Sequence, residues 1–173
     1  VRSLAGVFAV VLLPYSCKDD NKPLPSCDGV EWEYEGPEGP AYWADLCVDF
    51  ASCGGEQQSP VNIAGSTDDN NLTAITRNYA ATQAHIVNNG HTVQFNYDNG
   101  SEITLAGEKY QLLQFHFHTH SEHTLNGKVY PMEIHMVHRN EATGKIAVVG
   151  ILVEEGDENL VLQPFMGKFP STA

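Results

Sequence analysis

Two histidines alternate with phenylalanines in the segment Gln114-Phe115-His116-Phe117-His118, and a third histidine follows in Glu133-Ile134-His135. Side chains of a β-strand point alternately to opposite faces, so His116 and His118 share one face while the phenylalanines take the other. If the two segments pair as strands, three imidazoles converge. Three protein ligands leave one tetrahedral position open, which is the arrangement of a catalytic rather than a structural zinc ion.

Two polar side chains accompany these histidines on the same faces. Gln114 can accept a hydrogen bond from the ring of His116, and Glu133 can do so for His135, which would fix the tautomer of each ring. The alternative is that strand histidines are surface residues or hydrogen-bonded core residues. Three histidines at this spacing favour the zinc site.

The surrounding residues resemble the α-class carbonic anhydrases. The resemblance runs from about Trp32 to the end of the chain, in the family's order, and implies one Zn²⁺ ion bound by His116, His118 and His135. It also implies reversible hydration of CO₂ to bicarbonate. The motifs that carry it, besides the two histidine segments, are Ser121-Glu122-His123-Thr124, Gln58-Ser59-Pro60-Val61-Asn62-Ile63, Asn88-Asn89-Gly90-His91 and the aromatic stretch from Trp32 to Trp43.

The same resemblance implies roles for residues around the zinc. His91 would carry protons to buffer, since an imidazole of pKa about 6.5 suits a zinc-bound water of pKa about 7; by pattern alone it is also an ordinary turn residue. Tyr34 would order water along that path, and Glu122 would orient a threonine hydroxyl. Val137 and Val148 would line the wall that holds CO₂, although each also fits a plain core position.

Composition limits the other possibilities. A chain of 173 residues allows one ordinary domain, expected over residues 27–173. Nine basic residues against 22 acidic ones argue against binding the backbone of a nucleic acid. The sequence makes no prediction of oligomeric state.

Residues 1–26 are expected to be a signal and tether rather than part of the fold. The apolar run from Leu4 to Leu13 is too short to span a bilayer and is typical of a signal peptide. Ser16-Cys17-Lys18-Asp19-Asp20 resembles a bacterial lipoprotein cleavage site, so Cys17 would anchor the protein to a membrane. The alternative is a plain secretory signal. Both predict export, to the periplasm or the cell surface.

The remaining cysteines agree with export. Cys27 and Cys47 could pair with each other, but the sequence does not establish connectivity. By the family resemblance, Cys53 would form half of a disulfide with a later segment.

The predicted fold is mainly β: a central twisted, largely antiparallel sheet with short peripheral helices, of ten strands by the resemblance. Residues 27–57, rich in Gly, Pro and aromatics, predict irregular structure packed on a sheet. The first segment that favours a helix is Glu158–Met166. Strands are expected at Ile75–Tyr79, His85–Asn88, Thr92–Tyr97, Glu102–Leu105, Tyr110–His118, Val129–His138 and Ala147–Val153, separated by Asn-Gly and similar turns.

Two other functions fit part of the sequence pattern. A cupin barrel also places two histidines on a strand, and His116-x-His118-x-x-x-Glu122 fits its first metal motif, but the flanking glycines are missing. A carbonic-anhydrase-like adhesion or ligand-binding domain without turnover is the second alternative, which the three retained histidines disfavour.

The resemblance stops about two-thirds of the way through the family's domain, before its Thr-Thr-Pro segment, which Ser171-Thr172-Ala173 does not match. We therefore expect a chain that is incomplete at its C-terminus and, lacking an initiator Met, at its N-terminus. We also expect the 173-residue product to be poorly soluble, or less active than an extended one.

Overall fold

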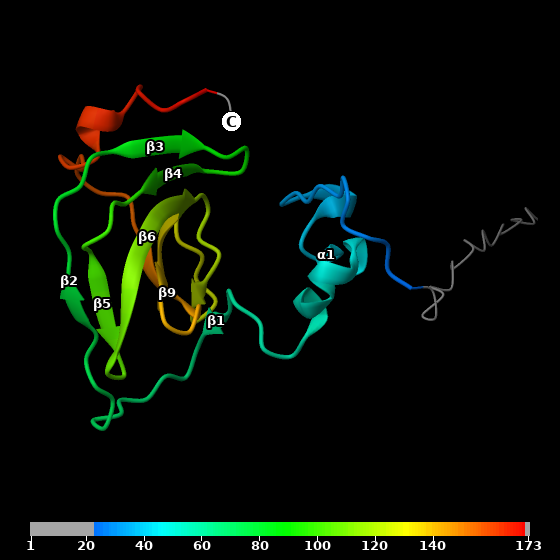
Figure 1. The fold of residues 1–173 in the computed structure, drawn as a ribbon, viewed down its shortest axis with the longest axis horizontal. Helices are drawn as coiled ribbons and strands as arrows, with labels where there is room; N and C mark the ends of the chain where they lie inside the picture. The colour runs from blue at the N-terminus through cyan, green and yellow to red at the C-terminus, as the bar shows by residue number, and fades with distance from the viewer. Residues whose placement is uncertain (1–22, 172–173) are drawn as a thin grey trace, which may run out of the picture. The chain divides into compact units, whose positions relative to one another are not determined.

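The computed structural model describes residues 23–171 (Figure 1). The expected signal segment, Cys17, Thr172 and Ala173 lie outside these residues. The chain divides into two compact units, one ending at Gly55 and one beginning at Glu56, and each is described by itself. From residue 23 to residue 171, no helix has the length and apolar character needed to cross a membrane.

The N-terminal unit is built from short helical turns: the 3₁₀ helices η1 (Gly36–Glu38) and η2 (Val48–Gly54), and the α-helix α1 (Trp43–Leu46). A disulfide joins Cys27 to Cys47 across 20 residues, the pairing that the sequence left open. The short turns match the irregular structure that its Gly- and Pro-rich composition predicts.

Three aromatic rings pack together in this unit. Trp32 packs edge-on against Tyr34 and Trp43, with ring centroids 5.4 and 5.3 Å away. The indole N–H of Trp43 donates to the carbonyl oxygens of Glu33 and Glu38, at 3.1 and 2.9 Å. The indole thus supplies hydrogen bonds to a backbone that has few regular ones.

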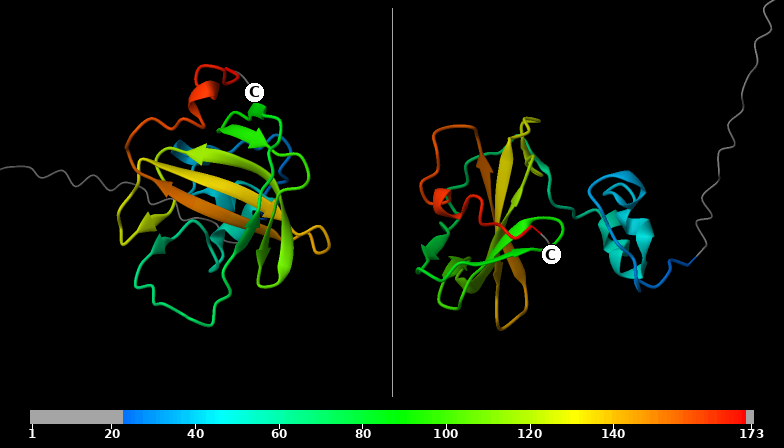
Figure 2. Two further views of the ribbon diagram at one scale, coloured as in Figure 1. Left: turned by 90° about the vertical axis from the view of Figure 1, so that its left-hand side faces the viewer. Right: turned by 90° about the horizontal axis from the view of Figure 1, so that it is seen from above.

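The second unit is a twisted sheet of seven strands, all paired antiparallel (Figures 1 and 2). Its longest strand, β6, pairs along one edge with β5 and then β4, and along the other with β8. The β2 and β3 strands extend the first side, and β9 pairs with β8. The strands are β2 (Thr76–Asn78), β3 (His85–Asn88), β4 (Val93–Asn96), β5 (Glu102–Leu105), β6 (Glu108–His118), β8 (Met132–Arg139) and β9 (Ile146–Val153).

All seven strands confirm predicted ones: β3 and β5 have the predicted bounds, and the ends of the others move by at most three residues. The largest change is at β8, expected from Val129 but beginning at Met132. Pro131 explains it, because a proline has no N–H to donate to a strand ladder. The described residues form seven strands in this sheet, where the resemblance implied ten.

Two short strands were not predicted. The parallel pair β1 (Asn62–Ile63) and β7 (Thr124–Leu125) forms a separate small sheet. The side-chain oxygen of Asn62 accepts hydrogen bonds from the Thr124 hydroxyl at 2.8 Å and from the Gly127 N–H at 2.9 Å. Two residues are too few to show strand alternation, so no pattern marks them.

The helix predicted over Glu158–Met166 is wrong. This segment contains a single 3₁₀ turn, η3 (Gln163–Phe165). The Asn159 side chain accepts the N–H groups of Val161 and Leu162, at 3.0 and 3.1 Å, and so forms a turn in place of a helix start.

The core lies on the face of β6 opposite its histidines. Phe95 of β4, which is 4% exposed, stacks on Phe115 with ring centroids 4.7 Å apart. Phe117 packs edge-on against Phe115 at 5.7 Å. The phenylalanines thereby anchor the strand that carries His116 and His118.

Candidate metal centre

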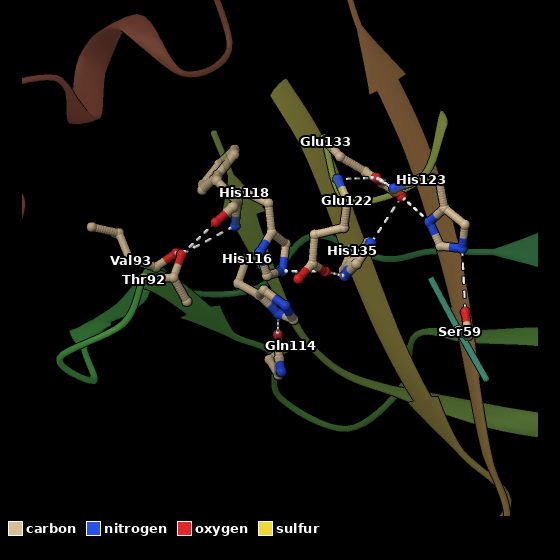
Figure 3. A network of polar contacts seen from close by, with 11 residues as sticks. Ser59, Thr92, Val93, Gln114, His116, His118, Glu122, His123, Glu133 and His135 are labelled. Atoms are coloured by element: carbon tan, nitrogen blue, oxygen red, sulfur yellow. Dashed lines mark hydrogen bonds and ion pairs between the residues drawn. The ribbon is translucent and has the colours of Figure 1, made fainter. Parts of the chain in front are cut away.

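The pairing of β6 with β8 brings the three predicted ligands together. His116 lies directly opposite His135 in the antiparallel register, and His118 lies opposite Glu133. The ring centroid of His118 is 4.9 Å from that of His116 and 4.6 Å from that of His135. One nitrogen from each ring lies within 4.8 Å of the other two, and Figure 3 shows the rings turned toward one another.

Two neighbouring acceptors determine which nitrogens face this space. Gln114 Oε1 is 2.9 Å from His116 Nδ1, and Glu133 Oε1 is 2.8 Å from His135 Nε2. A neutral imidazole donates from one nitrogen and offers a lone pair on the other. Nε2 of His116 and Nδ1 of His135 are therefore left as ligand atoms.

Glu122 supplies an oxygen beside the ligand nitrogens. Its Oε2 lies 3.3 Å from His118 Nε2 and 3.6 Å from His135 Nδ1. Burial raises the pKa of the Glu122 carboxyl, while His135 acts in the opposite direction. The carboxyl can therefore hold a proton more readily than an exposed glutamate.

Two of the ligand histidines, His116 and His118, are held in the neutral form. Burial, followed by the charges of His135 and His116, lowers the pKa of His118 from 6.5 to about 4. Burial and then His135 lower the pKa of His116 as well. Because metal ions bind the deprotonated ring, both ligands are ready to bind near neutral pH.

Glu133 is the central acceptor of the network in Figure 3. Oε1 accepts from His135 Nε2 and from His123 Nδ1, at 2.8 and 2.7 Å; Oε2 accepts from the backbone N–H of Glu122 and of His123, at 3.0 and 2.8 Å. Burial raises the pKa of this carboxyl, but the hydrogen bonds from His123 and His135 outweigh it and lower the pKa to about 2. Glu133 is therefore a permanent carboxylate at neutral pH.

The network extends from His123 to Ser59, whose hydroxyl lies 3.2 Å from His123 Nε2. Serine, histidine and glutamate in this order resemble a nucleophile, base and acid. The next residue is Pro60, however, which lacks the backbone N–H that stabilises an oxyanion after many nucleophilic serines. We therefore interpret Ser59 as an acceptor or donor that orients His123.

The donor set fits zinc. Three imidazole nitrogens, two with a fixed tautomer and two with a lowered pKa, match the three-histidine catalytic type of zinc site. His116, His118 and His135 would hold the ion, and Gln114 and Glu133 would orient two of the rings.

A cavity of about 470 Å³ lies next to this cluster, and His135 and Glu122 form part of its wall. The apolar side chains of Val148, Ile63 and Leu152 also line it. Val137, the other residue expected in the substrate wall, pairs with Val148 on the neighbouring strand and is not among the lining residues.

The other expected residues belong to other elements of the chain. His91 is exposed in the turn between β3 and β4, where its backbone N–H donates to Asn89 Oδ1 at 3.0 Å. Tyr34 belongs to the aromatic cluster of the N-terminal unit. Cys53 is an exposed free thiol in the described structure. The roles expected of His91 and Tyr34 stay predictions.

Sequence reasoning assigned no role to three residues that support the centre: Ser59, Thr92 and Gly150. Ser59 stands in a quoted motif, but nothing in the pattern pairs it with His123, 64 residues later. Thr92 was predicted only as the first residue of a strand, and alternation does not reveal that its hydroxyl bonds the backbone of Phe117. Gly150 has no side chain to signal a contact.

Comparison with known proteins decides the family. The family model described as eukaryotic-type carbonic anhydrase matches residues 38–172. The chain belongs to this family, the α-carbonic anhydrases. A carbonic anhydrase of the cyanobacterium Nostoc is 45% identical over 139 residues, which cover 78% of this chain and 52% of that protein. One from Pectobacterium atrosepticum is 36% identical over 169 residues, covering 97% of this chain and 67% of that protein.

Solved carbonic anhydrases share the fold. The structure of a hyperthermostable carbonic anhydrase from a hydrothermal vent chimney superposes with a TM-score of 0.78 at 39% identity, covering 82% of this chain and 64% of that one. The mainly β, antiparallel architecture is thus that of the α-carbonic anhydrases. The chain spans 52% to 67% of the lengths of these three relatives.

Proposed function

We propose that the chain binds one Zn²⁺ ion through His116, His118 and His135 and provides the site for reversible hydration of CO₂. The proposal rests on one observation: three imidazole nitrogens point into the same space. Hydrogen bonds to Gln114 and Glu133 orient two of the three rings. When bound, zinc supplies Lewis-acid activation of water at neutral pH, for which carbonic anhydrase is the best-known case.

The residues of the chain would divide the remaining work. The lowered pKa values of His116 and His118 keep these ligands neutral. Glu122 Oε2 is placed to accept a hydrogen bond beside them. The apolar side chains of Val148 and Leu152 offer CO₂ an apolar surface.

Replacing His118 by Ala tests the zinc site. Two ligands hold zinc poorly in a tetrahedral site, so we expect the variant to lose most of its zinc affinity, while His120→Ala, an exposed neighbour, retains it. Competition with a chromophoric chelator measures affinity, and stopped-flow assays measure CO₂ hydration. Zinc bound by His118→Ala as tightly as by the wild type would contradict the site. Zinc binding without hydration would favour the binding-domain alternative.

We propose His91 as the proton shuttle, on the basis of its exposed ring and the family resemblance. We expect His91→Ala to slow turnover in weak buffer, and added imidazole to restore much of the rate. His85→Ala, which removes another exposed imidazole, is the control. An unchanged rate of His91→Ala at low buffer concentration would remove the residue from proton transfer.

We also propose export with a lipid anchor on Cys17, supported by the apolar run and the cysteine that follow the pattern of bacterial lipoproteins. Fractionation of wild type and Cys17→Ser tests it. An equal distribution of both between membrane and soluble fractions would contradict the anchor.

A further inference from the structure

The position of the Glu133 carboxylate depends on a glycine of the neighbouring strand. Gly150 of β9 lies directly opposite His135 in the register with β8. A Cβ atom added to Gly150 would lie 2.7 Å from Glu133 Oε1 and 3.8 Å from His135 Cδ2. The first distance is shorter than Cβ contacts in real proteins, so any side chain at this position must displace the carboxylate.

Gly150 differs from the turn glycines of this chain. Gly90, Gly127 and Gly144 have positive φ angles and open space around the missing side chain, so their backbone conformation explains the glycine. Gly150 lies in a regular strand with no such angle, and what explains it is the close approach of Glu133.

The end of a flexible side chain could often move aside at little cost, but this one cannot. The Glu133 side chain is 1% exposed and its two oxygens accept four hydrogen bonds. A displaced carboxylate would leave N–H donors unsatisfied, a buried one at His135 and partly buried ones at His123 and Glu122.

We infer that Gly150 is a positioning residue of the metal centre, acting through Glu133. The absence of a side chain at 150 leaves room for the carboxylate that holds His135 in the tautomer with Nδ1 facing the site. The expected effect of Gly150 on zinc affinity rests on the proposed zinc site. Its effect on the position of the Glu133 carboxylate can be tested without metal.

The first test adds one methyl group. We expect Gly150→Ala to weaken zinc affinity by about tenfold or more, the range found for loss of a partner of a metal ligand. Gly156→Ala is the matched control, because a Cβ there meets nothing within 4 Å and the backbone has no positive φ. Equal zinc affinity of Gly150→Ala and wild type would overturn the inference. A wild type that binds no zinc would instead refute the proposed function.

A second test links Gly150 to Glu133 specifically. Glu133→Asp withdraws the carboxylate by one methylene group and so makes room for the added methyl. The double variant should bind zinc about as well as Glu133→Asp alone, a clear departure from additivity. It should also restore folding if Gly150→Ala alone does not fold. Effects that multiply, or a double variant that stays unfolded while Glu133→Asp alone folds, would show that Gly150 acts independently of Glu133.

A third readout needs no metal. In the zinc-free protein the imidazole N–H protons of His123 and His135 are bonded to Glu133 Oε1, which shifts their nuclear magnetic resonance signals downfield. Gly150→Ala should move or broaden both signals, and Gly156→Ala should preserve them. Unchanged signals in a folded Gly150→Ala would mean that the carboxylate has kept its place, against the inference.

Discussion

A buried histidine stands on the face of β8 opposite the metal ligands. His138 is 0% exposed, and its Nε2 lies 2.9 Å from the hydroxyl of Tyr79. Burial lowers the pKa of His138 from its ordinary 6.5, and the backbone groups of Met136 and Ala147 offset this in part. The folded protein therefore holds this ring neutral where the unfolded chain would protonate it.

The sign of the effect on stability follows from proton binding. Below pH 6.5 the unfolded chain binds a proton that folded His138 does not, so the free energy of unfolding falls as the pH falls toward the lowered pKa. We expect His138→Gln, which can still bond Tyr79, to reduce this slope by up to about 1.4 kcal/mol per pH unit. Urea unfolding of the zinc-free protein between pH 5 and 8 measures it.

The exposed His120 provides the control for that experiment, as His120→Gln removes an imidazole outside the core. If His138→Gln and the wild type lose stability with identical slopes, His138 is not the group responsible.

The three ligands could be predicted because histidines at strand spacing indicate a metal site. His116, His118 and His135 need only strand alternation and one pairing to converge. Gly150 and Ser59 could not be found in this way, because their contacts depend on how β9 and the segment before β1 approach Glu133 and His123 in space.

At the scale of the elements, a side chain holds β6 in place at the point where its backbone pairing with β4 ends. The Thr92 hydroxyl donates to the carbonyl oxygen of Phe117 at 2.6 Å and lies 3.3 Å from the N–H of the same residue. Phe117 separates His116 from His118, so Thr92 fixes the backbone that carries two ligands.

We expect Thr92→Val, which keeps the shape but removes both hydrogen bonds, to lower the free energy of unfolding by about 1–3 kcal/mol. It should also weaken zinc affinity, because the ligand-bearing end of β6 is then less well held. Thr92→Ser keeps the hydroxyl and should behave much like the wild type. Chemical denaturation and zinc titration of the three proteins give the comparison, and a fully stable Thr92→Val would contradict it.

The strands could be predicted far better than the segments between them. In β6 and β8 the side chains alternate between two faces over eight or more residues, which indicates a strand. Turn residues such as Asn126-Gly127 separate the strands. The segment after β9 misleads because Leu160 and Val161 suggest a buried helix face, yet they are 78% and 77% exposed. Asn159 and Pro164 determine the local backbone there.

At the scale of the whole molecule, each of the two units contains groups whose state can be measured separately. Both tryptophans of the chain, Trp32 and Trp43, lie in the N-terminal unit with the Cys27–Cys47 disulfide. The three candidate ligands and the partners described for them lie in the second unit. Tryptophan fluorescence and zinc affinity therefore report on different parts of the same chain.

Removing the disulfide should separate these two signals. Closing a loop of this length stabilises by about 3 kcal/mol in the chain-entropy account. We expect the paired change Cys27→Ser and Cys47→Ser to shift unfolding followed by tryptophan fluorescence to lower urea, while zinc affinity stays within about twofold of wild type. Cys53→Ser, which changes the free thiol, controls for loss of a cysteine. A large fall in zinc affinity would show that the ligand geometry depends on the N-terminal unit.

The register between β6 and β8 has a consequence for refolding. A slip of one residue would turn the histidines of one strand to the core face, and a slip of two would move His135 away from His116. Of these pairings, the native one alone places His135 opposite His116 and Glu133 opposite His118. An ion that binds that pairing selectively stabilises it by mass action. Zinc present at the start of refolding would thus act as a template that selects the correct strand alignment, and should give a larger native yield than zinc added afterwards.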